Sequence, residues 1–276
     1  MATTPIEVSF KNGEYEVMRM IHSQQTVSVK ALSFVDSLVV DVLSRVSHQA
    51  RRLASDANKH TVTINEVQQA VHLVFPERLA IFANSQAQNT MDTFLKHSYE
   101  YAQTLAEDDD AEGSPSPSLK HKKPTTKAVL AGIQFNVGTC YQLLKQQQKH
   151  SPESSTTPNN HLKVSRGAPV YLAAVGEYVT AELSELSGCC AFDQKRMKLL
   201  WSDVVLAIRN DEELLKLVGD KLLQLESSFK PSPQPHGDQP VEEDDPEVPD
   251  RPINSAALEE EGVTQDIDAD SDPLSP

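Results

Sequence analysis

Apolar residues recur at steps of three and four, or sums of such steps, over residues 32–57 of the chain. This spacing places them on one stripe of an α-helix of roughly 27 residues, because a helix turns once in about 3.6 residues. A stripe of that length cannot be buried by the helix that carries it. The chain must therefore supply a second surface to cover it. The residues of the stripe are Leu32, Val35, Val39, Val42, Val46, Leu53 and Ala57.

Other helices are predicted on both sides of this one and again in a second segment. Thr63 and Glu66 have capping-box spacing, since the threonine side chain can accept the unpaired N–H three residues on. Pro76 ends one helix and suits the first turn of the next. Neither βαβ alternation nor a strand-period run occurs, so the predicted fold class is all-α. The further helices are predicted at Tyr15–His22, Ile64–Val74, Glu77–Tyr101, Asn136–Gln148, Pro169–Cys190 and Ser202–Asp211.

The order short, long, short thus occurs twice, and two such units can bury their stripes by crossing their long helices. Residues 107–127, EDDDAEGSPSPSLKHKKPTTK, are charged and rich in Ser and Pro, which indicates a linker. About 20 flexible residues span roughly 25 Å on average. They hold the second unit at an effective concentration near millimolar. We therefore expect the units to pair within one chain.

The end of the chain is strongly acidic. From Lys230 onward it holds 14 acidic and 2 basic residues, so this segment carries −12 of the net charge of −15. With so little apolar content it cannot offset the entropy of ordering, and we expect disorder. The predicted organisation is a helical unit at residues 10–106, a linker at 107–127, a second helical unit at 128–229 and an acidic tail at 230–276.

Several classes of function lack their sequence signals. Cys140, Cys189 and Cys190 have no CxxC spacing, which argues for a reducing compartment and against a disulfide framework or a zinc site. We interpret the Cys189–Cys190 pair as small core residues. No apolar run approaches the roughly 18 residues of a membrane span, and the first residues lack a signal-peptide core. Catalytic and phosphate-cradling motifs are missing. We expect an intracellular protein without enzymatic activity, cofactor or membrane association.

Two blocks of sequence resemble histone 2A. They are residues 166–186, RGAPVYLAAVGEYVTAELSEL, and residues 206–214, LAIRNDEEL. The resemblance runs from Ala131 to Gly219, opening with AGIQFNVG and ending with LKLVG. From Tyr15 to about His97 the chain resembles histone 2B, with YEVMRMIH, SLVVDVLSRV, QARRLA and TVTINEVQQAVHLVFPERLA. The two resemblances cover more than half of the chain in uninterrupted order.

The resemblance implies a fused histone doublet, similar to those of large DNA viruses. Residues 10–106 would be a histone 2B-like fold and residues 128–229 a histone 2A-like fold, paired as an intramolecular handshake dimer. A divergent germline-type cellular histone is the alternative. The implied partners are double-stranded DNA and a tetramer of histones 3 and 4. The implied location is the nucleus and chromosome, or a host nucleus or virion for a viral protein.

In the family, loops between the helices hold DNA phosphates through basic side chains, hydroxyls and helix N-termini. Here Thr139 and Gln142 stand where the family has arginines, and Trp201 replaces a proline. Each lost phosphate contact removes about one released counterion. We therefore expect non-specific DNA binding that is weaker than that of an ordinary histone pair. The matching positions with a suitable side chain are Ser28, Lys30, Lys59, Thr61, Lys145, Lys163, Lys195, Arg196 and Lys198.

Six carboxylates of histone 2A form a surface that receives an arginine or a basic peptide from partner proteins. All six matching positions are acidic here. At about 100° per residue, the three on the long helix fall within an arc of ~140° and can share a face. Two glutamates of histone 2B at the rim are replaced by Arg78 and Gln86. The predicted docking residues are Glu177, Glu182, Glu185, Asp211, Glu212 and Glu213.

After Gly219 the family continues with an extended segment that docks onto the tetramer of histones 3 and 4. This chain reads DKLLQLESSFKPSP, for which we predict a continued helix.

Two functions remain. The first is a structural chromatin protein, a surrogate for the histone 2B–histone 2A dimer in nucleosome-like particles; retained loop lysines favour it. The alternative is a chaperone-like or decoy protein that binds basic histones, histone chaperones or patch-reading peptides; the net charge and the missing segment favour it. We expect the first.

Overall fold

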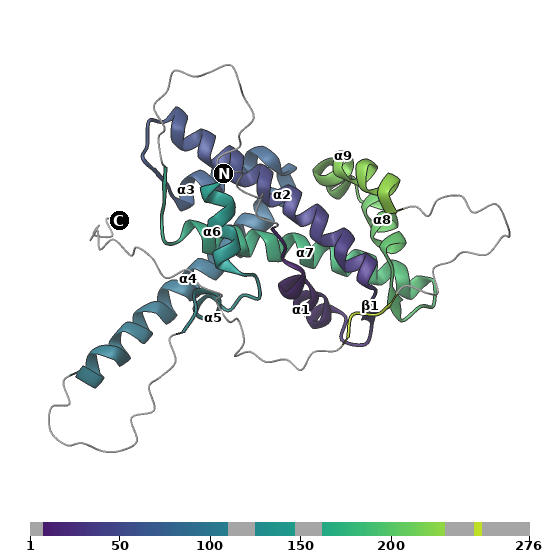
Figure 1. Cartoon of the computed structure of the whole chain (residues 1–276), viewed down its shortest axis with the longest axis horizontal. Coiled ribbons are helices and arrows are strands. Elements are labelled where there is room, and N and C mark those ends of the chain that lie inside the picture. Colours follow the sequence, from purple (N-terminus) through teal and green to yellow (C-terminus); the bar gives the residue numbers. More distant parts are fainter. Residues whose placement is uncertain (1–7, 110–124, 147–161, 230–245, 250–276) are drawn as a thin grey trace, which may run out of the picture.

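Helices make up nearly all the secondary structure in the computed structural model, which describes residues 8–109, 125–146, 162–229 and 246–249 (Figure 1). The first unit consists of α1 (Lys11–Ile21), β1 (Thr26–Val27), α2 (Val29–Asp56), β2 (Thr61–Val62), α3 (Ile64–Val74) and α4 (Glu77–Asp109). The second consists of α5 (Lys127–Ala131), α6 (Val137–Lys145), β3 (Lys163–Val164), α7 (Ala168–Asp193), β4 (Lys198–Leu199), α8 (Trp201–Asn210) and α9 (Glu212–Phe229). The predicted order short, long, short is confirmed in both units.

The ends of the two long helices follow from local backbone chemistry. Ser28 caps α2, and its hydroxyl oxygen accepts the N–H of Ala31 at 3.0 Å. A proline in the first turn begins α7, where its missing N–H costs nothing. Beyond each helix one residue adopts the left-handed conformation, Asn58 (φ 53°) after α2 and Lys195 (φ 57°) after α7. The two units therefore leave their long helices by the same turn.

Reciprocal strand pairing joins the units at both ends of the long helices. β1, which precedes α2, pairs in parallel with β4, which follows α7. β2, which follows α2, pairs in parallel with β3, which precedes α7. The start of each long helix therefore lies beside the end of the other, and α2 and α7 cross head to tail (Figure 1). This confirms the predicted all-α class and the handshake of two tandem histone folds.

One hydrophobic core extends through both units. Most of the α2 stripe is buried in it, and the first nine residues of α7, Ala168 to Gly176, are all buried, so that this part of α7 is enclosed on every side. The helices approach closely at Gly176, where a Cβ atom would lie 2.8 Å from the ring of Phe135 and 3.0 Å from Leu43. The hydroxyl of the fully buried Tyr171 donates to Asn84 Oδ1 on α4 at 2.8 Å, and burial raises the pKa of Tyr171 to about 12. Contacts between the units thus form the interior of the molecule.

Some predictions are corrected by the structure. Helix α4 continues to Asp109 rather than ending near Tyr101, and a short helix, α5, precedes α6. The four two-residue strands were not predicted, because two residues carry no periodic signal. Cys189 is exposed and Cys190 half-buried, so the interpretation of this pair as core residues was wrong for Cys189. The predicted helix after Gly219 is confirmed by α9.

Most of the predicted disordered linker and of the predicted acidic tail lies outside the described residues. The ends of the predicted linker do not: residues 107–109 belong to α4, and Lys127 begins α5. Within the described ranges, no helix is both long and apolar enough to cross a bilayer.

Candidate functional site

The β1–β4 contact, which we call the first loop pair, brings basic residues from both units together. The N–H of Thr26 donates to the carbonyl of Met197 at 2.8 Å, and the N–H of Ser28 donates to that of Leu199 at 3.0 Å. These bonds place the first turn of α2 beside the loop that follows α7. Both segments carry predicted DNA-binding residues. Lys30 and Lys195 are exposed, and Lys198 and Arg196 are partly buried.

Two of the predicted residues at this loop pair have structural roles. Ser28 is fully buried, and its hydroxyl is committed to capping α2. The guanidinium of Arg196 forms two bonds to the carboxylate of Asp203, at 2.5 and 2.8 Å. Asp203 also accepts the N–H of Leu200 at 2.9 Å and so caps α8. Ser28 and Arg196 are thus engaged within the fold, whereas Lys30 and Lys195 are exposed to solvent.

The β2–β3 contact, the second loop pair, repeats this arrangement at the other end. The N–H of Lys163 donates to the carbonyl of His60, and that of Ser165 to Val62, both at 2.9 Å. Lys163 is exposed, and Thr61 is partly buried. Arg166 is an exposed arginine just before α7 that was not among the predicted DNA-binding residues. Its guanidinium lies 6.0 Å from the ring centre of Phe94. Its position close to Lys163 in the sequence is the feature from which it could have been predicted as a DNA-binding residue.

Lys59 is the counterpart of Arg196 in the second loop pair. Its ammonium lies 2.5 Å from a carboxylate oxygen of Glu66. Glu66 also accepts the N–H of Thr63 at 2.8 Å, which confirms the predicted capping box. Burial tends to raise the pKa of Glu66, but the bonds from Lys59 and Thr63 outweigh it and lower the pKa. Half of the Lys59 side chain is exposed, so it retains access to solvent.

The last predicted cation, Lys145, lies near the second loop pair. It is exposed in the final turn of α6, which contacts both β3 and α2. Its ammonium lies 5.7 Å from the ring centre of Tyr141. The side chain of Arg51 on α2 donates to the carbonyl of Leu144 at 2.6 Å and so satisfies the end of α6. Lys145 therefore lies on a helix, α6, that Arg51 anchors to the first unit.

Glu182 is electrostatically coupled to Glu185 and Asp211 where α7 meets the junction of α8 and α9, and Glu213 acts on the neighbouring Tyr178. Burial raises the pKa of Glu182, and the negative charges of Glu185 and Asp211 raise it further, against a hydrogen bond from the Tyr178 hydroxyl. The pKa of Tyr178 is raised by burial and then by Glu182, Glu213 and Asp211. We call Glu182, Glu185, Asp211 and Glu213 the acidic cluster. It could receive a cationic side chain.

The other two predicted carboxylates are engaged elsewhere. Glu177 accepts the backbone N–H groups of Gln134 and Phe135, the second at 3.0 Å, and so holds the loop before α6. Burial raises the pKa of Glu177 to about 7, although these two hydrogen bonds lower it. Glu212 is exposed and pairs with Lys216 at 2.6 Å on α9. Glu177 therefore positions a loop, and Glu212 is partly neutralised by its partner.

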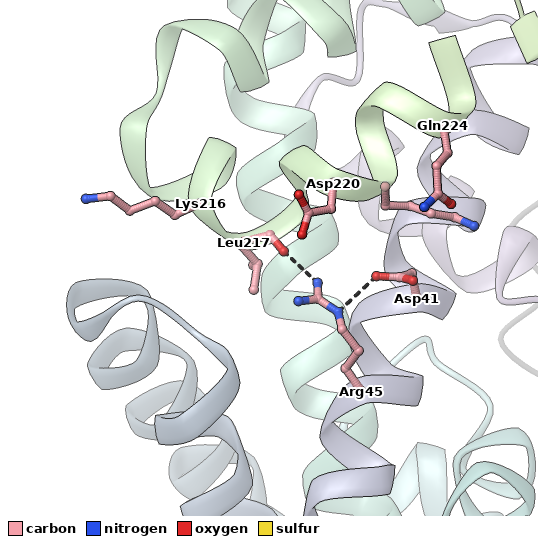
Figure 2. Close-up of a pocket in the computed structure, with 7 residues that line it drawn as sticks. Asp41, Arg45, Lys216, Leu217, Asp220 and Gln224 are labelled. Carbon is pink, nitrogen blue, oxygen red and sulfur yellow. Dashed lines mark hydrogen bonds and ion pairs between the residues drawn. The ribbon is translucent and has the colours of Figure 1, made fainter. Parts of the chain in front are cut away.

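Helix α9 packs against α2 and α8, and together with α2 it lines a pocket of about 130 Å³. In Figure 2, Arg45 on α2 donates to the carbonyl of Leu217 on α9 at 2.5 Å and pairs with Asp41 at 2.9 Å. At the far end of α9, Phe229 packs edge-on against Phe34, with ring centres 5.1 Å apart. These contacts fix α9 to both units as a folded element.

The crossed long helices, the reciprocal loop pairs and the single shared core define a protein of the histone-fold class. No protein-family model matches the chain. It is 46% identical over 99 residues to probable histone H2A.1 of Arabidopsis thaliana, covering 36% of this chain and 67% of the relative. The chain belongs to the histone 2A family.

Two rice proteins, each described as probable histone H2A.4, are also similar. They come from Oryza sativa subsp. indica and subsp. japonica, and each is 45% identical over 97 residues, which are 35% of this chain. The chain spans about half of their length, 53%. Among solved structures, the histone from Methanopyrus kandleri aligns at a TM-score of 0.41 with 15% identity, over 73% of this chain and 93% of that one.

Proposed function

We propose that this chain is a fused histone doublet that binds DNA non-specifically and packages it in nucleosome-like particles. Its first unit would act as the histone 2B-like half and its second as the histone 2A-like half, at the boundaries given above. The reciprocal loop pairing carries this proposal. Each loop pair combines cations from both units, so one chain presents the two DNA-facing ends that otherwise need two proteins. We propose that it acts on chromosomes in the nucleus.

Binding to DNA would use the phosphates rather than the bases. Lys30, Lys195 and Lys198 at the first loop pair, and Lys59 and Lys163 at the second, would each neutralise a phosphate. The hydroxyl of Thr61 and the N-termini of the long helices would add hydrogen bonds. Arg166 and Lys145 would extend the second site. With two cations held in ion pairs, affinity would be modest and would fall steeply with salt.

The acidic cluster would dock a basic peptide of a partner protein. An arginine can form bidentate, charge-assisted bonds with two carboxylates, and Glu182 and Glu185 lie one helical turn apart. Arg78 and Gln86 are exposed on α4, which packs on α7. They would replace acidic groups at the rim and so weaken docking relative to an ordinary histone pair.

A second candidate is a chaperone-like or decoy protein for basic histones. The observation that favours it is α9. A helix fixed to α2 and α8 occupies the stretch that would otherwise reach a tetramer of histones 3 and 4, and the chain carries a net charge of −15. Such a protein would bind basic histones without wrapping DNA.

Reconstitution separates the two candidates. The full chain would be mixed with histones 3 and 4 and a long duplex, and the product digested with micrococcal nuclease. Packaging predicts a protected DNA fragment longer than histones 3 and 4 protect alone, and the double variant Lys195→Glu, Lys198→Glu should lose the gain. The matched control is Lys11→Glu, Lys96→Glu, which changes the same charge at exposed sites away from the loop pairs. A complex with histones that adds no protection would favour the chaperone.

A further inference from the structure

A short segment of the acidic tail lies against the first loop pair. Residues Pro246–Pro249 run antiparallel to β1, with Glu247 paired to Ser28. The N–H of Val248 donates to the carbonyl of Val27, and the N–H of Val29 donates to the carbonyl of Pro246, both at 2.9 Å. Figure 1 shows this segment in yellow beside β1. It therefore extends the β1–β4 pair by a third strand, from the side of β1 opposite β4.

The sequence of this segment, PEVP, suits a strand that pairs on one edge only. Prolines at both ends lack an N–H, so sheet growth stops there. Val248 is partly buried and packs against the hydrophobic core, whereas Glu247 stays exposed. The carboxylate of Glu247 accepts a hydrogen bond from the Thr26 hydroxyl at 3.1 Å. Backbone pairing, an apolar contact and a polar contact thus hold the same four residues.

The donors that this segment uses are groups that a DNA phosphate would need. The N–H of Val29 is the first amide of α2, at the positive end of the helix dipole. The Thr26 hydroxyl lies on the adjoining strand, and Lys30 follows in the first turn of α2. While the segment is bound, a carbonyl takes the amide and a carboxylate takes the hydroxyl. Its negative charge also repels phosphate.

We propose that Pro246–Pro249 is a tethered inhibitory strand that competes with DNA for the first loop pair. This rests on the proposed function, because it requires that the loop pair binds phosphate. The tether keeps the strand at high effective concentration, yet two backbone bonds and one valine are few enough for a polyanion to displace them. DNA binding at the first loop pair then requires release of the strand.

Three variants test this competition with a duplex of about 20 base pairs at 50 mM salt. Val248→Pro removes the donor to Val27 without changing charge and should tighten DNA binding about five- to tenfold, the typical contribution of one net hydrogen bond or slightly more. Glu247→Gln should tighten it less, since the strand can still pair. Glu259→Gln makes the same charge change elsewhere in the tail and should leave affinity near that of the parent. Circular dichroism and thermal melting check that each variant folds.

A second readout follows the strand itself. In the parent protein, amide exchange of Val248 should be slow without DNA and fast at saturating DNA. A chain that stops after Asp245 lacks the strand together with further acidic residues, so it should bind DNA at least as tightly as Val248→Pro, and it serves as the strand-free protein if that variant does not fold. Equal DNA affinity of the parent and both strand-free proteins, or continued protection of Val248 with DNA bound, overturns the inhibitory role alone. If parent and strand-free proteins all fail to bind DNA, the proposed function fails, and the inhibitory role with it.

Discussion

The guanidinium of Arg196 bonds both carboxylate oxygens of Asp203, seven residues further along the chain, at 2.5 and 2.8 Å. Lys59 and Glu66 repeat this relationship in the first unit at 2.5 Å, again seven residues apart. In both units the acid also caps the third helix of the short–long–short set. In each unit, the ion pair thus links the loop that follows the long helix, which pairs with the other unit, to the helix that comes after that loop.

Removal of these acids should destabilise the fold unequally. Asp203 is almost fully buried and Arg196 is 29% exposed, whereas Lys59 is 49% exposed. Breaking a buried pair typically costs about 3–5 kcal/mol, and exposure of the cation lowers that cost. We expect Asp203→Ala to lower the free energy of unfolding by about 3 kcal/mol and Glu66→Ala by about half as much, measured in urea. Equal losses would contradict the ranking by exposure.

Cleavage of the linker should leave the two units associated. Tyr171, buried and hydrogen-bonded to Asn84, lies at the interface of the units, and the core extends through both. A protease site inserted within residues 110–124 would be cut and the product examined by light scattering and gel filtration. We expect the uncut protein to have the mass of one chain and the cut halves to elute together. A two-chain species before cutting, or separate halves after it, would contradict the doublet.

Stability should fall as pH rises through the titration of Glu14. This side chain is fully buried, and neither of its carboxylate oxygens has a hydrogen-bond partner among the residues that the structure describes. Burial, and then the negative charge of Asp36, raise its pKa well above the ordinary value. Because the folded-state pKa exceeds the unfolded one, the stability linked to Glu14 is complete below the unfolded pKa. It is lost as pH rises through the folded pKa.

A neutral side chain of similar length should remove this dependence. We expect Glu14→Met to reduce the fall in stability over the range above the ordinary pKa of glutamate, leaving the part that follows from the raised pKa of Glu177. It should raise the free energy of unfolding at the upper end of that range by about 1–3 kcal/mol. Chemical unfolding across this range provides the measurement. The control is Glu16→Met, two residues away and only partly buried, which should keep the parent's profile. A parent whose stability does not fall with pH would refute the assignment.

Trp201 should stabilise the docking of α9. It stands where the histone 2A family has a proline, and its ring lies 5.9 Å from that of Phe34 and 6.3 Å from that of Phe229. Trp201→Pro suits the first turn of α8 but removes these contacts. We expect a loss of about 1–3 kcal/mol, below the cost for a fully buried aromatic, with faster amide exchange in the last turns of α9. Trp201→Phe should retain most of the protection.

Periodicity predicted α2 because its apolar stripe records burial directly in the sequence, whereas the start of α7 is buried on all sides and carries no single stripe. The long-range loop contacts were less visible, since a two-residue strand such as β1 has no period and pairs through backbone groups that every residue has. The roles of individual site residues depend on what lies opposite them. Ser28, Arg196 and Glu177 have side chains suited to a binding site, yet each satisfies an internal group. Sequence spacing alone could not distinguish these three internally bonded residues from Lys30 or Glu185, whose side chains are exposed.

The acidic cluster should bind an arginine-bearing peptide independently of DNA. Glu182 and Glu185 lie on one face of α7, and Glu182 is coupled to Asp211 at the start of α9. Loss of a charged partner at a desolvated site typically costs ~2–5 kcal/mol. We therefore expect Glu182→Ala, Glu185→Ala to abolish binding of a patch-reading peptide in titration calorimetry, while melting temperature and DNA affinity change little. Arg78→Glu should strengthen binding, because it replaces a cation on α4, which packs on α7, with a carboxylate.

Acid should weaken this docking earlier than it would for an ordinary surface carboxylate. Docking of an arginine requires ionised carboxylates, and burial together with Glu185 and Asp211 raises the pKa of Glu182. As pH falls, Glu182 takes up its proton before an isolated glutamate would, and peptide affinity declines with it. Glu185→Gln, which removes one of the charges that raise this pKa, should shift the decline to lower pH. Absence of peptide binding to both the parent and Arg78→Glu would mean that the cluster is only a solvated surface.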